Sequence, residues 1–159
     1  MPYARVVPAA IKAADEQIVP ALMNPRLDYS RLVLLTPDAP VVTPPLESLP
    51  PPLASRATVT TWEPGAMTVR LDPVPEQDAY VVVSENWYPD WHATVDGKPA
   101  EVVRGQQTLI TVRVPRGAHE VRLWFASPSY VTGKGLSLAS LGAAALWLLV
   151  PLALRRRRG

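Results

Sequence analysis

The sequence contains no cysteine, which excludes disulfide bonds and thiolate metal sites. It also carries little net charge, because the formal charge of +2 becomes −2 once the four arginines at 155–158 are set aside. No basic stripe remains in the rest of the chain, so nucleic acid is not an expected partner. Because disulfide bonds are excluded, any domain outside the cytoplasm must be held together by its hydrophobic core alone.

Charged residues are also missing from the twenty residues between Gly135 and Leu154. A helix of this length spans about 30 Å, the thickness of the hydrocarbon core of a bilayer. We therefore predict a transmembrane helix over 132–154, which contacts membrane lipid. The alternative, a buried helix of a soluble protein with a basic tail, is less compatible with so long an uncharged run.

Basic residues at the end of this run predict its orientation. Arginine-rich flanks stay on the cytoplasmic side, which makes residues 155–159 a cytoplasmic tail and places the soluble part outside the cytoplasm. The topology determinant is Arg155, Arg156, Arg157 and Arg158. The localisation expected for this chain is the cell membrane, crossed once.

The N-terminus lacks a basic stretch followed by a long apolar core, the pattern of a secretory signal. Ser137, Ser140 and Gly142 are small residues of the kind that pack against other transmembrane helices. We therefore expect the chain to be the last part of a larger polytopic protein, whose other helices are its partners.

Two regions are expected before the main domain. Residues 1–36 predict a small strand–helix–strand segment, with strands at 4–7 and 32–35. The helix between them is expected to run from Asp15 to Met23, with Asp15 as its N-cap. Residues 37–56 follow, with seven prolines between Pro37 and Pro52. Such a composition predicts a stiff, extended connector that is not a packed element.

Residues 57–128 predict an antiparallel β-sandwich of the jelly-roll or immunoglobulin-like kind, which makes the chain mainly β. Apolar residues alternate with polar ones, as in the stretch that begins at Met67, and the apolar run 79–84 suits a central strand. Asp96-Gly97 predicts a two-residue type I′ hairpin turn. Pro99 then places the returning strand at a sheet edge.

Five segments resemble a known family. Three of them are residues 84–99 (SENWYPDWHATVDGKP), 114–121 (VPRGAHEV) and 127–133 (SPSYVTG), which are similar to patterns near the C-terminus of the YfhO-like bacterial membrane proteins. The other two are RVVPAA at 5–10 and RLD at 26–28, which resemble the region before those patterns. Asp90 stands where that family usually has glycine. The resemblance covers most of the chain.

The resemblance implies a polytopic protein related to the GT-C glycosyltransferases, which modify cell-envelope polymers with lipid-linked sugars. The family's catalytic acids lie among its N-terminal helices, which implies no catalytic residue and no enzyme activity in this chain alone. The expected function is that of a non-catalytic extracytoplasmic domain and last membrane helix. The alternative is a membrane-anchored accessory or carbohydrate-binding module that partners a polytopic protein.

Three aromatic residues are candidates for contact with a cell-envelope glycan or with lipid headgroups: Trp87, Tyr88 and Trp91. The alternative is that Trp91 belongs to the core while Trp87 and Tyr88 cover one end of the sandwich. His92 and Asp96 share a strand face about 13 Å apart, too far for a metal site. We therefore expect no metal and no cofactor.

Overall fold

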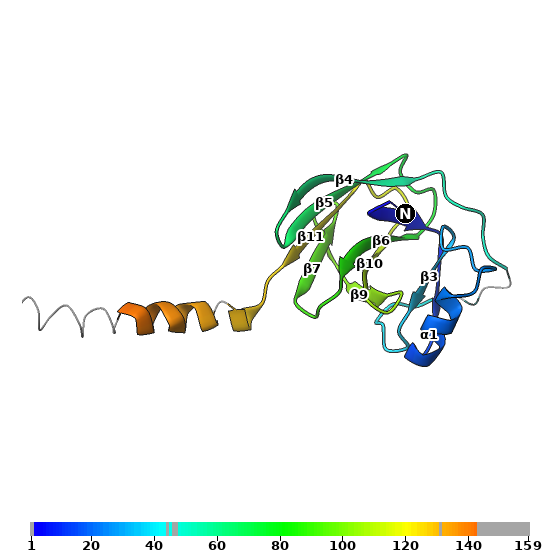
Figure 1. The fold of residues 1–159 in the computed structure, drawn as a ribbon. Coiled ribbons are helices and arrows are strands. Elements are labelled where there is room, and N and C mark those ends of the chain that lie inside the picture. Colours follow the sequence, from blue (N-terminus) through cyan, green and yellow to red (C-terminus); the bar gives the residue numbers. More distant parts are fainter. Residues whose placement is uncertain (1, 44, 46–47, 131, 143–159) are drawn as a thin grey trace, which may run out of the picture. The chain divides into compact units, whose positions relative to one another are not determined.

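The computed structural model describes residues 2–43, 45, 48–130 and 132–142. It divides into two units, Met1–Ala126 and Ser127–Gly159, and each is described by itself. The first unit consists mainly of β-strands (Figure 1). This confirms the expectation of a mainly β chain.

Two sheets make up the first unit. The strands of the larger sheet are β1 (Ala4–Val7), β2 (Ala9–Lys12), β3 (Leu32–Leu35), β6 (Ala79–Asn86), β9 (Val102–Gly105) and β10 (Leu109–Val114). Those of the smaller sheet are β4 (Arg56–Glu63), β5 (Ala66–Asp72), β7 (Trp91–Val95), β8 (Lys98–Ala100) and β11 (Glu120–Phe125). Their orders are β1-β6-β10-β9-β3-β2 and β4-β5-β11-β7-β8. Paired strands within residues 56–125 are antiparallel, as predicted for 57–128, and the one parallel pair of the described strands, β2 and β3, belongs to the N-terminal strand–helix–strand segment.

Alternating side chains of the two sheets form one shared core. In β5, Met67, Val69 and Leu71 are buried, and the intervening residues are more exposed, as the two-residue period of a half-buried strand requires. They pack with buried residues of β6 and β10 in the other sheet. Every residue from Ala79 to Val83 is buried, because β6 lies inside the larger sheet between β1 and β10. The apolar run is therefore a central strand, as predicted.

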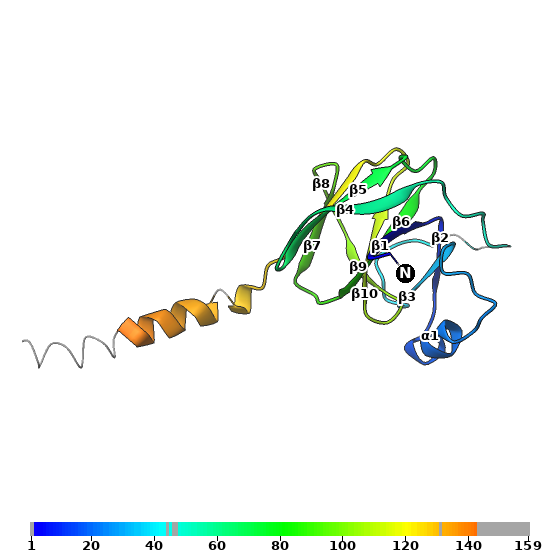
Figure 2. The ribbon, with the colours of Figure 1, turned by 45° about the horizontal axis from the view of Figure 1, so that its top comes forward.

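The N-terminal segment belongs to the larger sheet (Figure 2). Its helix, α1 (Asp15–Leu22), connects the parallel strands β2 and β3 and buries Ile18 completely against them. The prediction of Asp15 as N-cap is wrong, because Ala14 takes that position without a side-chain cap. The Asp15 carboxylate instead pairs with Arg104 at 2.8 Å.

The proline-rich segment is packed against the domain, which corrects the prediction of an unpacked connector. Ala39 and Val41 are buried beside residues of β6 and β9. The Lys12 ammonium donates to the carbonyl oxygen of Ala39 at 2.7 Å, and the Arg31 guanidinium donates to that of Pro50 at 2.6 Å. Proline has no backbone N–H, so such a segment can cover apolar surface with few unpaired donors.

The predicted hairpin is confirmed. Asp96 and Gly97 both have positive φ, 48° and 77°, and β7 pairs with β8 directly across them. These values match a type I′ turn. Pro99 lies in β8 at the edge of the smaller sheet, where a missing N–H breaks no ladder hydrogen bond.

In the second unit, residues 128–130 and 132–142 are helical. No helix within the described part of the chain is long and apolar enough to cross a bilayer. The second half of the predicted span, 143–154, and the predicted tail, 155–159, lie outside the described residues.

Candidate binding surfaces

The three candidate aromatic residues lie on and beside the loop between β6 and β7. The Trp87 N–H donates to the carbonyl oxygen of Thr108 at 2.6 Å, and the Ala126 N–H donates to that of Asp90 at 2.9 Å. These bonds tie the two ends of the loop to different parts of the domain. The loop therefore directs its aromatic side chains to separate places.

Trp91 lies in the core. Its side chain is 9% exposed and packs with the apolar residues shared by the two sheets. Its ring meets that of Phe125 edge to face, with centroids 5.7 Å apart. This burial favours the packing interpretation of Trp91 over contact with a glycan.

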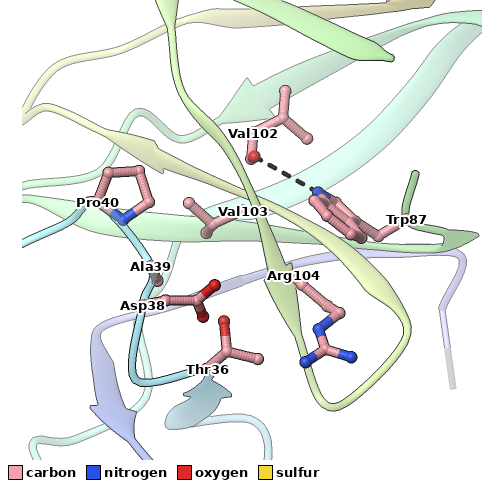
Figure 3. A pocket seen from close by; sticks show the side chains of 8 residues that line it. All are labelled: Thr36, Asp38, Ala39, Pro40, Trp87, Val102, Val103 and Arg104. Carbon is pink, nitrogen blue, oxygen red and sulfur yellow. Dashed lines mark hydrogen bonds between the residues drawn. The ribbon is translucent and has the colours of Figure 1, made fainter. Parts of the chain in front are cut away.

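Trp87 turns toward a different surface. It is half-buried, and its Nε1 donates to the carbonyl oxygen of Val102 at 3.4 Å. Figure 3 shows its indole ring beside a cavity of about 210 Å³. The cavity is lined by Thr36, Asp38, Ala39, Pro40, Trp87, Val102, Val103 and Arg104. We call it the Trp87 cavity.

Two side chains of opposite charge, Asp38 and Arg104, line the cavity together with Trp87 (Figure 3). The Asp38 carboxylate accepts hydrogen bonds from the Thr36 hydroxyl and from the backbone N–H of Asp38 itself, and both lower the pKa of Asp38. The charges of Arg104 and Lys12 lower this pKa by smaller amounts. Arg104 is held in place by two hydrogen bonds to Asp15, at 2.8 and 3.0 Å. The Trp87 cavity thus combines an indole with an ionised carboxylate and a fixed guanidinium.

This combination suits a small hydroxylated ring. Apolar C–H faces can pack on an indole, while carboxylate and guanidinium groups accept and donate hydrogen bonds with hydroxyl groups in the plane of such a ring. Sequence reasoning found Trp87 but missed Thr36, Asp38 and Arg104. Thr36 and Asp38 lie where the proline-rich segment begins and Arg104 lies in β9, and the sequence gives no sign that the chain brings them together.

Tyr88 is exposed, as are Tyr3, Trp62 and Phe125. Its ring contact with Phe125, whose N–H is bound at Gly65, places Tyr88 at the end of the two-sheet unit that holds the β4–β5 turn. We call these four residues the aromatic end. The rings of Tyr88 and Phe125 meet edge to face at 6.5 Å between centroids. Sequence reasoning did not connect Tyr88 with the other three, because they come from strands far apart in the chain.

The titratable residues near the loop have local structural partners. His92 stacks on Trp124, and the Asp96 carboxylate accepts hydrogen bonds from the backbone N–H groups of His119 and Glu120, at 3.1 and 2.9 Å. Glu85 accepts a hydrogen bond from the Tyr3 hydroxyl at 2.7 Å. Among the described residues, no three histidine or acidic side chains are grouped as metal ligands would be.

Comparison with known proteins gives one family. Residues 53–137, more than half of the chain, match the family described as bacterial membrane protein YfhO. Comparisons with curated proteins and with solved structures give no significant match. The matched region runs from Leu53, just before β4, through the loop that carries Trp87 and Tyr88 and into the second unit.

Proposed function

Because the chain belongs to the YfhO family of bacterial membrane proteins, we propose that it is the extracytoplasmic domain and last membrane helix of a polytopic protein related to glycosyltransferases. In this proposal the domain is non-catalytic and binds the saccharide acceptor that a catalytic part elsewhere in the protein modifies. The proposal keeps the division predicted from the sequence, with a membrane helix at 132–154 and a cytoplasmic tail at 155–159.

The Trp87 cavity is the observation that carries the acceptor-binding role. Its volume of about 210 Å³ is of the order of one monosaccharide unit, and it offers one aromatic wall and several polar groups. The neighbouring ion pair between Arg104 and Asp15 fixes the guanidinium before any ligand arrives. A fixed polar group loses less conformational entropy on binding than a free one.

The location of the domain outside the cytoplasm is supported by charge. The uncharged run 135–154 is followed by four arginines, and Lys134 is the lone basic residue directly before it. Such asymmetry favours a cytoplasmic C-terminus. An extracytoplasmic domain would then face cell-envelope polymers, the substrates that the resemblance implies.

Saccharide binding tests the proposal. The full chain, reconstituted in lipid nanodiscs, is applied to a panel of hexose and N-acetylhexosamine oligosaccharides, and the best ligand is titrated by calorimetry. We expect Trp87→Ala to weaken binding by about fivefold, since one aromatic contact contributes of the order of 1 kcal/mol. Trp87→Phe should retain part of the affinity because it keeps an aromatic wall.

Trp62→Ala is the matched control, since Trp62 is an exposed tryptophan outside the Trp87 cavity. This variant should bind the saccharide as the parent chain does. Equal affinity of Trp87→Ala and the parent, with unchanged thermal unfolding, would overturn the acceptor-binding role. Absence of binding to every saccharide in the panel would also count against it.

A further inference from the structure

Exposed aromatic side chains gather at a single end of the first unit. We propose that this aromatic end lies in the lipid–water interface of the membrane, in contact with phospholipid headgroups. The exposed fractions are 39% for Tyr3, 61% for Trp62, 58% for Tyr88 and 41% for Phe125. The other described tyrosine and tryptophan residues of residues 2–126 are buried or half-buried. The proposal rests on the membrane helix of the proposed function.

Backbone hydrogen bonds bring three of the four residues together. The Phe125 N–H donates to the carbonyl oxygen of Gly65 at 2.7 Å, which holds the end of β11 at the turn between β4 and β5. Trp62 precedes this turn near the end of β4. Tyr88 approaches the same place through its ring contact with Phe125. The aromatic end therefore has a fixed structure and is not a set of isolated side chains.

Tyr3 completes the aromatic end through side-chain contacts. Burial and the hydrogen bond to Glu85 raise the pKa of the Tyr3 hydroxyl, while a hydrogen bond with Trp62 acts in the opposite direction. These contacts place Tyr3 beside both Trp62 and the end of β6. Its ring thus joins those of the loop and the β4–β5 turn on one surface.

A short stretch of chain connects the aromatic end to the uncharged run. Phe125 and Ala126 are the last residues of the first unit, and only residues 127–134 separate them from Gly135. Eight residues span at most about 28 Å when fully extended. If 135–154 enters the bilayer, the aromatic end is held within that distance of the point of entry.

The opposite end of the unit has a different chemistry. There the loop between β5 and β6 meets the end of β10, and Asp78 pairs with Arg113 at 2.8 Å. It carries this ion pair beside the exposed aliphatic residues Val42 and Val74, whereas the aromatic end combines apolar rings with hydroxyl and indole N–H groups. Tryptophan and tyrosine of this kind are enriched where a membrane protein meets the headgroup region.

The acidic residues near the aromatic end indicate which lipids it contacts. Glu85 and Asp90 lie beside it and would repel anionic headgroups. We therefore infer that the rings themselves supply the contact, in a bilayer of phosphatidylcholine as well as in one with anionic lipid. On phosphatidylcholine, raising the salt concentration should leave the contact unchanged, because screening weakens only interactions between charges.

The absence of cysteine allows single labels to be introduced. Asn86→Cys places a label beside the aromatic end without removing a ring, and Gln77→Cys places one at the opposite end, where Gln77 is exposed. Ala145→Cys marks the uncharged run itself. Each variant of the full chain carries an environment-sensitive fluorophore in phosphatidylcholine nanodiscs, with or without lipids that carry a quencher, placed near the headgroup for the labels at 86 and 77 and in the acyl chain for the label at 145.

We expect quenching of the label at 86 to be at least about twofold stronger than at 77, as for a group held in the interface. Replacing Trp62 and Tyr88 by serine in the Asn86→Cys chain should reduce that quenching, with thermal unfolding measured to show that the domain still folds. Equal quenching at 86 and 77, with strong quenching at 145, would overturn the inference and leave the membrane helix intact.

Two other outcomes also decide the question. A label at 86 that is shielded from water but not quenched by lipid would show that protein covers the aromatic end, and would overturn the lipid contact. A label at 145 that no lipid quencher reaches would overturn the membrane helix of the proposed function, and the inference with it.

Discussion

At the scale of single residues, Gly105 has no room for a side chain. It lies at the end of β9, where it pairs with both β10 and β3. A methyl group there would collide with Oγ1 of Thr111 and approach Cγ2 of Val33 to 2.9 Å. Because both neighbours are fully buried, we expect Gly105→Ala to lower the free energy of unfolding by about 1–3 kcal/mol, as overpacking does in other cores.

A double-mutant cycle with Thr111→Ala tests this reason. Oγ1 of Thr111 is buried without a hydrogen-bond partner among the described residues, so its removal breaks no hydrogen bond to that part of the chain. The pair Gly105→Ala and Thr111→Ala should therefore cost less than the sum of the two single changes in chemical unfolding. Strictly additive costs would show that the collision with Thr111 is not the cause.

The candidate aromatic residues show what can be predicted residue by residue. The alternation in 91–95 predicts correctly that Trp91 faces the core, because strand geometry fixes the side of each side chain. Trp87 and Tyr88 lie in a loop, which has no such period. Their neighbours, Arg104 for Trp87 and Phe125 for Tyr88, are set by strand pairing across the whole domain.

At the scale of elements, the Asp78 carboxylate links the β5–β6 loop to the end of β10 and the turn after it. It accepts a hydrogen bond from the Arg116 N–H at 3.1 Å and pairs with the Arg113 guanidinium at 2.8 Å. The hydrogen bonds from Arg116 and Arg113 lower the pKa of Asp78, and the charge of Arg113 adds to this. The folded protein therefore binds a proton at this carboxyl less readily than the unfolded chain does.

The sign of the pH dependence follows from this depressed pKa. The stability that Asp78 contributes is present above its unfolded pKa and is lost as the pH falls through its folded pKa. Asp78→Asn should flatten the loss of stability on acidification, by less than about 1 kcal/mol because the pair is half-exposed. Chemical unfolding between neutral and acidic pH measures this. Glu76→Gln, which removes an exposed carboxylate of the same loop, is the control for the loss of one negative charge there.

Elements in which apolar residues alternate regularly, or which contain a defined turn sequence, could be predicted from the sequence. Elements whose position depends on contacts with residues far away in the chain could not. The strands from Met67 onward and the Asp96-Gly97 hairpin follow from local pattern. The packing of Ala39 and Val41 on the larger sheet does not, because proline composition describes backbone stiffness and says nothing about apolar surface elsewhere in the chain. The position of Asp15 was missed for a related reason, since its partner Arg104 is distant in the sequence.

At the scale of the whole molecule, the first unit depends on residues that precede the family match. The match begins at Leu53, yet β1 and β3 pair with β6 and β9 of the matched region. The sequence predicts the positions of these two strands correctly, but it does not predict the sheet to which they belong, because strand partners many residues apart leave no local signal. Besides the core shared by the two sheets, the unit has a buried cluster around Val33 and Val41 and another around Ile18, and both are built largely from residues before the match.

This dependence predicts the behaviour of the matched region alone. A fragment of residues 53–137 lacks β1, β2, β3 and α1, which leaves β6 and β9 with unpaired edges and uncovers Tyr80, Val82 and Val103. Exposed edges and apolar surface favour aggregation and loose packing. We expect this fragment to aggregate or to unfold without a cooperative transition, whereas residues 1–137 unfold cooperatively. Thermal unfolding followed by circular dichroism compares the two, and a cooperative transition of 53–137 at the temperature of the longer chain would show that the N-terminal strands are dispensable.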